Sequence, residues 1–226
     1  MGNKDFGYDI DVVTRMAEDV SMVLDKGVDV CLTIGGGNIC RGSTISELGI
    51  ERVTGDFMGM LATVMNAISM QSIMETKFGK DTRVMSSIAM KSVCEVYVCR
   101  KALNHMKRGK LVIFAAGIGS PFFTTDTCAV LRALEMKCDA VFKGTSVDGV
   151  YSADPKHNPD AIRYDKVSYQ DILAKQLRIM DPSAVALARD NKMSIVVFSV
   201  RKDRHPLFKA ICEDGKHTEI SEESEI

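Results

Sequence analysis

The stretch Val28-Asp29-Val30-Cys31-Leu32-Thr33-Ile34, followed directly by Gly35-Gly36-Gly37-Asn38, decides the class of fold. Its first seven residues are mostly apolar, which is typical of a buried strand. A strand that delivers a run of glycines has the shape of a loop that holds phosphate through backbone N–H groups. The run alone also fits a simple tight turn, so the rest of the chain has to separate the two interpretations.

Two further predicted strands end in the same way. Leu111–Ala116 leads into Gly117-Ile118-Gly119-Ser120-Pro121, and Ala140–Phe142 leads into Lys143-Gly144-Thr145. In an open α/β sheet, ligands bind at the carboxyl ends of the strands. Three such loops at one edge are therefore expected to surround an anionic ligand with several phosphates.

Helical and strand patterns alternate along the chain, which predicts an α/β fold with a mainly parallel sheet. Apolar periodicity and capping residues predict helices at Asp11–Lys26, Asp56–Phe78, Lys101–Arg108, Thr124–Met136, from Asp181-Pro182 onward and at Leu207–Cys212. Further strands are predicted at Arg83–Ile88 and Ser194–Val200.

Composition limits the function. The chain has 226 residues, which suits one domain or one domain with two lobes, and its net charge of −1 offers no basic field for nucleic acid. The seven cysteines form no C-x-x-C pair, and the four histidines lie far apart, so a disulfide framework or a metal cage is not expected. A hard cation carried by nucleotide phosphates remains open.

No part of the sequence predicts export or membrane insertion. Residues 1–11 lack the apolar core of a signal peptide, and the most apolar helix is interrupted by Asn66, Ser69 and Gln71. We therefore expect a cytoplasmic protein with no membrane partner.

A few charged residues stand close to the loops. The guanidinium of Arg41 suits a phosphate, although an exposed salt bridge is the alternative. Asp126 would repel phosphate directly, so it either orients a lysine, holds Mg²⁺ or serves as a plain helix cap. Lys143 is predicted at the end of a buried strand, where a lysine needs an anionic partner.

The chemistry that fits these residues is phosphoryl transfer, which depends on positioning and on neutralisation of charge. The chain has no G-x-x-x-x-G-K-[ST] and no dinucleotide fingerprint followed by a ribose-binding acid. It also lacks the protein-kinase set, because Asp5-Phe6-Gly7 stands alone near the start with no H-R-D before it. The P-loop, dinucleotide-binding and protein-kinase classes are therefore disfavoured.

Several runs, in order over about residues 6–213, are similar to the bacterial uridylate kinases of the amino-acid-kinase superfamily. They are Ile34–Asn38 with Arg41-Gly42, Gly55-Asp56 with Met58–Thr63, Pro121–Asp126, Val147–Tyr151 with Ala153–Pro155, and Met180-Asp181. The resemblance implies a three-layer αβα sandwich with a mainly parallel central sheet. It implies one domain over 1–226, with an acceptor-binding part at about 1–135 and an ATP-binding part at about 136–226.

The resemblance also implies the reaction and its residues. ATP would phosphorylate UMP with Mg²⁺, giving ADP and UDP, with Arg41 and Asp126 as catalytic residues. UMP would be held by Gly36, Asp56, Ile118, Gly119, Ser120, Pro121, Phe122, Phe123, Thr124 and Thr125. ATP would be held by Gly37, Arg41, Lys143, Thr145, Tyr151 and Asp154.

Members of this family are usually homohexamers that GTP activates and UTP inhibits, so the resemblance implies these partners as well. The apolar segment 57–74 would suit a subunit interface, although its methionines also fit a core helix. Ile118, Ser120 and Ser146 depart from the residues usual in the family, which implies altered contacts to uridine or phosphate.

The largest departure concerns the start of the chain. The family opens with a strand and a Lys-x-Ser-Gly-Glu loop, and Met1-Gly2-Asn3 resembles the segment after that loop. A mis-set start, a truncation and a chain without activity are three explanations. Two alternatives to uridylate kinase activity stay open: a non-catalytic nucleotide-binding subunit of the same fold, and a kinase with a carboxylate acceptor.

Overall fold

The computed structural model describes residue 7 and residues 9–40, 49–155, 157–177, 179–201 and 204–222. Contacts divide the chain into two compact units, Met1–Cys128 and Ala129–Ile226. The functional division near residue 135 that the resemblance implies stays a prediction.

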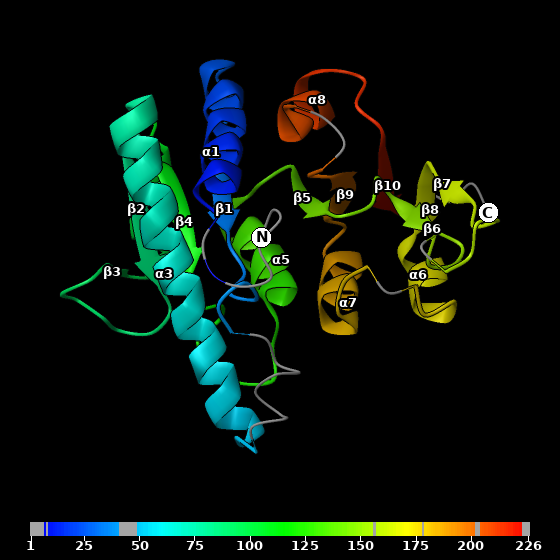
Figure 1. Ribbon diagram of the computed structural model, residues 1–226, viewed down its shortest axis with the longest axis horizontal. Coiled ribbons are helices and arrows are strands. Elements are labelled where there is room, and N and C mark those ends of the chain that lie inside the picture. Colours follow the sequence, from blue (N-terminus) through cyan, green and yellow to red (C-terminus); the bar gives the residue numbers. More distant parts are fainter. Residues whose placement is uncertain are drawn as a thin grey trace. The chain divides into compact units, whose positions relative to one another are not determined.

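The first unit contains a four-stranded parallel sheet. Its strands lie in the order β1 (Cys31–Thr33), β4 (Leu111–Ala115), β2 (Thr82–Ser86) and β3 (Glu95–Val96). The helices of this part of the chain are α1 (Ile10–Asp25), α3 (Arg52–Phe78), α4 (Cys99–Met106) and α5 (Thr125–Met136), and the boundary between the units falls within α5. Because the strands are parallel, the loops that follow β1 and β4 leave the same edge of the sheet (Figure 1).

The N-cap of helix α1 is Asp9, which lies two residues before Asp11, the cap that the sequence pattern predicts. The carboxylate of Asp9, not that of Asp11, accepts a hydrogen bond from the backbone N–H of Val12 at 3.4 Å. The apolar positions Ala17, Val20 and Val23 are buried on one face, as the 3.6-residue period predicts.

Helix α3 is longer than predicted, because it begins at Arg52 instead of Asp56. It ends at Phe78 and is followed by the capping residue Gly79, which adopts the left-handed conformation with φ 63°. The helix packs against α1, β2 and β4 and lies beside α1 in Figure 1.

Helix α3 is long enough and apolar enough to cross a membrane, which the polar residues within it did not lead us to expect. Half of its most apolar window is buried inside the protein. One such helix is weak evidence for a membrane span, since the core helix of a water-soluble domain has the same length and composition.

The second unit contains a mixed four-stranded sheet and a short ribbon. Its strands lie in the order β5 (Ala140–Thr145), β9 (Ser194–Ser199), β10 (His217–Ser221) and β8 (Lys166–Ser168), and only the β9–β10 pair among them is antiparallel. The ribbon joins β6 (Val150–Tyr151) to β7 (Arg163–Tyr164), and the helices are α6 (Tyr169–Ala174), α7 (Pro182–Asp190) and α8 (Pro206–Cys212).

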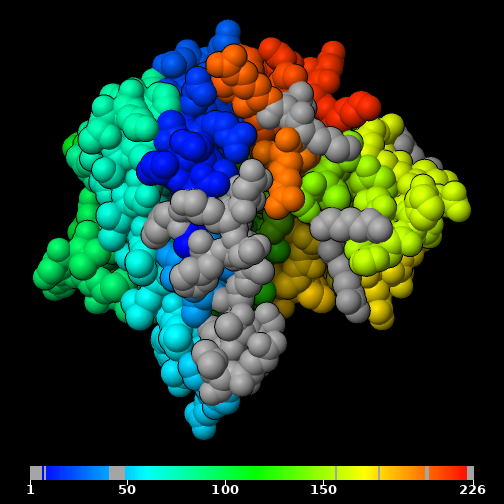
Figure 2. Space-filling model, in the orientation of Figure 1, coloured from blue at the N-terminus to red at the C-terminus, as the bar shows by residue number. Residues whose placement is uncertain are grey.

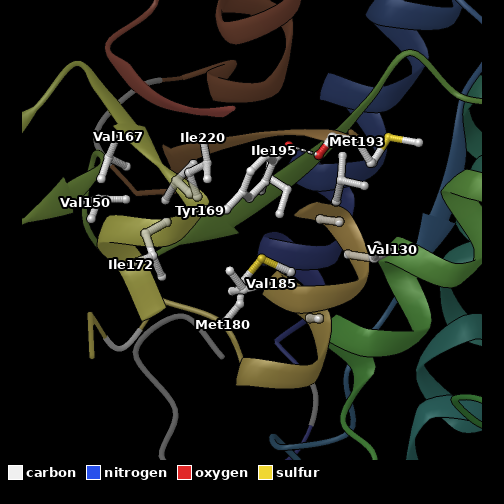
Figure 3. Close-up of a cluster of buried hydrophobic side chains, with 14 of the residues drawn as sticks. Val130, Val150, Val167, Tyr169, Ile172, Met180, Val185, Met193, Ile195 and Ile220 are labelled. Carbon is white, nitrogen blue, oxygen red and sulfur yellow. Dashed lines mark hydrogen bonds between the residues drawn. The ribbon is translucent and has the colours of Figure 1, made fainter. Parts of the chain in front are cut away.

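The core of this unit gathers side chains from the sheet and from α6 and α7 (Figure 3). Tyr169 is buried at its centre, and its hydroxyl donates to the backbone carbonyl of Met193. Burial, followed by the charges of Glu222 and Glu219, raises the pKa of Tyr169 to about 12. The ring is therefore held neutral and fixed by one polar contact within an apolar cluster.

Candidate active site

The first glycine loop follows β1 and lies directly against α3. A Cβ atom added to Gly36 would stand 2.7 Å from the carbonyl oxygen of Gly59 and 2.9 Å from the Cβ of Ala62. Only a glycine fits so close an approach of loop to helix. Gly37, by contrast, has open space at the same point.

Two asparagines hold this loop in place. The amide of Asn66, on α3, donates to the carbonyl oxygen of Gly35 at 2.7 Å and to the side-chain oxygen of Asn38 at 2.6 Å. Asn38 in turn donates to Asn66 at 3.1 Å and to the carbonyl oxygen of Gly7 at 3.2 Å. A largely buried amide with these partners fixes the loop more firmly than backbone turns alone would.

The second glycine loop follows β4. Ala116, at its start, is fully buried with φ 59°, and its N–H donates to the hydroxyl of Thr63 on α3 at 2.7 Å. The hydroxyl of Ser87 donates to the carbonyl oxygen of Gly117 at 2.7 Å, and Gly119 follows with φ 84°. The loop therefore begins with a strained turn that neighbouring hydroxyls stabilise.

Asp56 connects the first turns of α3 to the far end of this second loop. Its carboxylate accepts from the Nε–H of Arg52 at 2.9 Å and from the backbone N–H of Phe122 at 2.8 Å. The guanidinium of Arg52 lies 5.4 Å from the centre of the Phe122 ring, and Phe122 has φ 70°. Arg52 contacts both oxygens and Phe122 only Oδ2, so the carboxylate is oriented from two sides and Oδ1 keeps room for another donor.

These elements enclose a cavity of about 410 Å³, a size ordinary for a small-molecule site. The residues expected to hold UMP that line it are Gly36, Asp56, Ile118, Ser120, Phe123, Thr124 and Thr125. Gly119, Pro121 and Phe122 belong to the same loop but are not among its described lining residues. Cys40 also lines the cavity, and burial raises the pKa of its thiol, which favours the protonated form.

Helix α5 begins at one wall of this cavity. The hydroxyl of Thr124 accepts from the N–H of Asp126 at 3.0 Å, so Thr124 caps the first turn and Asp126 lies within that turn. The interpretation of Asp126 as a plain helix cap is therefore wrong, because Thr124 is the cap. The start of α5 turns hydroxyls and N–H groups toward the cavity, an arrangement that favours an anion.

The residues expected to hold ATP lie mainly in the second unit. Lys143 is inside β5, not at its end, because the strand continues to Thr145. The hydroxyl of Thr145 donates to the carbonyl oxygen of Val147 at 2.8 Å and shapes the turn after the strand. Tyr151 donates to the buried carboxylate of Asp148 at 2.7 Å.

Asp154 lies in the turn that follows β6, where its carbonyl oxygen accepts from the N–H of Asn158 at 2.9 Å. Arg41 lies outside the described residues. Within the described ranges, no group of three or more His, Cys, Asp or Glu side chains gathers as a metal cage. Mg²⁺ usually binds through one or two carboxylates together with substrate phosphates, and the single carboxylate of Asp126 beside an anion-favouring cavity fits that pattern.

The sequence model of the amino acid kinase family matches residues 2–199. The chain belongs to the amino acid kinase family. This membership confirms the α/β fold class that the sequence predicts.

Members of this amino acid kinase family with similar sequences are named uridylate kinases. One from Anaplasma marginale is 50% identical over 222 residues, which cover 98% of this chain and 89% of the relative. One from Rickettsia prowazekii is 49% identical over 223 residues, covering 98% of this chain and 91% of the relative.

Solved structures of amino acid kinases agree. The UMP kinase of Bacillus anthracis superposes with a TM-score of 0.92 at 36% identity, covering 99% of this chain and 91% of that one. The UMP kinase of Ureaplasma parvum superposes with a TM-score of 0.89 at 30% identity, covering 96% and 94%.

The sequence analysis gave no supporting role to four residues that the structure shows holding the site: Arg52, Thr63, Asn66 and Asp148. Arg52 and Asp56 are four residues apart, which is the spacing of an ion pair along a helix, and this signal could have identified Arg52 from the sequence. Asn66 was noted only as an interruption of an apolar helix, although a polar residue on a buried face needs a partner.

Proposed function

We propose that this chain transfers the γ-phosphoryl group of ATP to UMP, giving ADP and UDP. The observation that carries the proposal is the cavity between the two glycine loops and α3, in a chain about half identical to uridylate kinases over nearly its whole length. The cavity is lined by backbone N–H groups, which can bind the phosphate of a nucleoside monophosphate, and by one oriented carboxylate, which can bind its ribose.

The acceptor nucleotide is held at both ends. Backbone N–H groups of Gly36 and of the start of α5 face its phosphate, with the hydroxyls of Thr124 and Thr125. Asp56 accepts from the ribose hydroxyls through Oδ1, which Phe122 does not contact and which keeps a lone pair beside its bond from Arg52. The loop 118–123 contributes the remaining contacts to the nucleotide.

The donor nucleotide is held by Gly37, Lys143, Thr145, Tyr151 and Asp154. Lys143 neutralises phosphate charge, and Tyr151 offers its ring to the adenine. Arg41 stabilises the charge on the group in transfer, the role in which a guanidinium fork is most effective. Mg²⁺, carried by ATP and near Asp126, would neutralise charge on the phosphates. The protein supplies position and charge, because phosphoryl transfer needs no covalent intermediate on the enzyme.

We also propose a cytoplasmic homo-oligomer, a hexamer by family resemblance, with GTP as activator and UTP as inhibitor. Support for association comes from α3, where Val53, Phe57, Leu61, Met65 and Ile68 form an exposed apolar stripe at helical spacing. The first turns of this helix, coloured cyan, reach the surface in Figure 2. Sedimentation of the wild type and of Leu61→Glu tests the stripe: smaller particles for the variant support it, and equal sizes refute it.

The decisive experiment measures ADP release from ATP and Mg²⁺ with UMP, CMP, acetylglutamate or aspartate as acceptor. A second version carries the strand and Lys-x-Ser-Gly-Glu loop that the resemblance implies ahead of residue 1. Release that depends on UMP, in either version, supports the proposal. Release with a carboxylate acceptor, or ATP binding without turnover in both versions, refutes it and favours a carboxylate kinase or a non-catalytic subunit, respectively.

A further inference from the structure

One face of α3 lies beneath both glycine loops. Gly59, Thr63 and Asn66 are spaced by four and three residues, so they stand on the same face of the helix. Thr63 is 4% exposed and Asn66 is 9% exposed, which sets both apart from the ordinary surface polar residues of a helix. Polar side chains on a buried face are retained where they satisfy other buried groups.

Thr63 serves the second loop. Its hydroxyl accepts from the N–H of Ala116 at 2.7 Å and donates to the carbonyl oxygen of Met60 in its own helix, also at 2.7 Å. Ala116 is fully buried and left-handed, so its N–H needs this acceptor and its conformation depends on surrounding support. The hydroxyl therefore connects the first residue of the loop to a fixed point on α3.

The same turns of the helix serve the first loop. Asn66 donates to the carbonyl oxygen of Gly35, and a Cβ atom added to Gly36 would stand 2.7 Å from the carbonyl oxygen of Gly59 and 3.1 Å from the backbone nitrogen of Thr63. Thr63 therefore lies close to one loop through its backbone and bonds to the other through its hydroxyl. The separation between the loops, and hence the width of the cavity that they enclose, depends on this residue.

We propose that Thr63 is a positioning residue, which sets the separation of the two loops that hold the acceptor nucleotide. This inference rests on the proposed function, because it concerns the cavity assigned to UMP. Thr63 also lines the cavity, but its hydroxyl is already occupied by two protein partners, so it acts on the nucleotide through Ala116 and Gly36. Its loss would displace a phosphate-holding loop, and a displacement of about 1 Å can lower turnover by roughly a hundredfold.

The test compares three variants of the full chain. Thr63→Val keeps the shape but removes the hydroxyl, and Thr63→Ser restores the hydroxyl. Thr76→Val is the matched control, because the exposed hydroxyl of Thr76 donates to the carbonyl oxygen of Ser72 within the same helix and contacts neither loop. Each is assayed in the version of the protein that is active, below its unfolding transition, with rates normalised to the folded fraction.

For Thr63→Val we expect kcat/KM for UMP to fall by at least about tenfold while KM for ATP stays within about twofold. Thr63→Ser recovers most of the loss, and Thr76→Val matches the wild type. Amide hydrogen exchange at Ala116, measured without nucleotide, accelerates in Thr63→Val alone.

Three results would overturn parts of this reasoning separately. If Thr63→Val matches Thr76→Val in UMP kinetics, the positioning role is wrong although the proposed function stands. If exchange at Ala116 is unchanged in Thr63→Val, the placement of the hydroxyl is wrong. If the wild type shows no activity with UMP in either version, the proposed function fails and the role of Thr63 in turnover fails with it.

Discussion

Replacing Gly36 with alanine probes the contact between the first glycine loop and α3. The added methyl would lie 2.7 Å from the carbonyl oxygen of Gly59, 2.9 Å from the Cβ of Ala62 and 3.1 Å from the N–H of Thr63. Two of these atoms belong to a helix backbone, which cannot turn aside as a flexible side chain can. We expect a loss of about 1–3 kcal/mol in the free energy of unfolding, the usual cost of overpacking a filled site.

Gly37→Ala is the control, because no heavy atom lies within 4 Å of the position of its Cβ. Since alanine also restricts the unfolded chain, we expect this variant to be unchanged or stabilised by up to about 1 kcal/mol. Urea unfolding followed by circular dichroism gives both values, with the slope used to check that the unfolded states are comparable. Equal midpoints for the two variants would refute the packing argument.

Three other substitutions address separate parts of the molecule. Asp56→Ala should raise KM for UMP about 10- to 100-fold through loss of a hydrogen bond to a charged group, with far less effect on KM for ATP in steady-state kinetics. The pKa of Tyr169 is raised to about 12 in the folded protein, above its ordinary value of 10.0. Because the unfolded state therefore loses the phenol proton first, the free energy of unfolding should fall as pH rises from about 10 to about 12. Urea unfolding across this range should show a shallower decline for Tyr169→Phe. Asp181→Ala removes the side-chain acceptor for the N–H of Ala184 and should cost about 1 kcal/mol in the same unfolding assay.

Each of these has a contrary result. Equal losses for UMP and ATP in Asp56→Ala would remove that residue from the acceptor site. The same decline with pH in Tyr169→Phe as in the wild type would show that another group titrates. An unchanged midpoint for Asp181→Ala would mean that water replaces the cap without cost.

The sequence predicted the start of a helix correctly where only one residue could act as its N-cap. Asp181 followed by Pro182 left a single choice, and the structure has that cap. At the start of α1, Asp9 and Asp11 are both acceptable caps by residue type; the pattern predicts Asp11, whereas the structure has Asp9. The backbone conformation that separates them is set by how the helix packs, which the sequence pattern does not carry.

The glycine signal was right about loops at Gly35–Gly37 and misleading at Gly144. That residue pairs with Phe198 inside the β5–β9 ladder, so β5 continues to Thr145. Pairing with a strand some fifty residues later in the chain overrides the local preference of glycine for turns. The short strands β8 and β10 were missed because their pairing partners are distant in sequence. The short helix α6 was missed although Ser168 caps it locally.

The resemblance identified residues expected to contact a nucleotide, but not the neighbouring residues that hold those side chains and loops in position. Asp56 was named while Arg52 was not, and Gly36 was named while Asn66 was not. Supporting residues leave no motif of their own, because any side chain that reaches the right atom can do the work. They become visible only through distances such as the 2.7 Å between Thr63 and Ala116.

Helix α3 is used on nearly its whole circumference. Its inner face carries Thr63 and Asn66 against the loops, while Leu61 and Met65 extend the exposed apolar stripe. For an evolving sequence, this leaves few sites where a substitution is neutral, and these are polar positions near the end of the helix such as Ser72. Genetic drift in this family should therefore proceed slowly along α3, and a library of random variants should lose most of its members there.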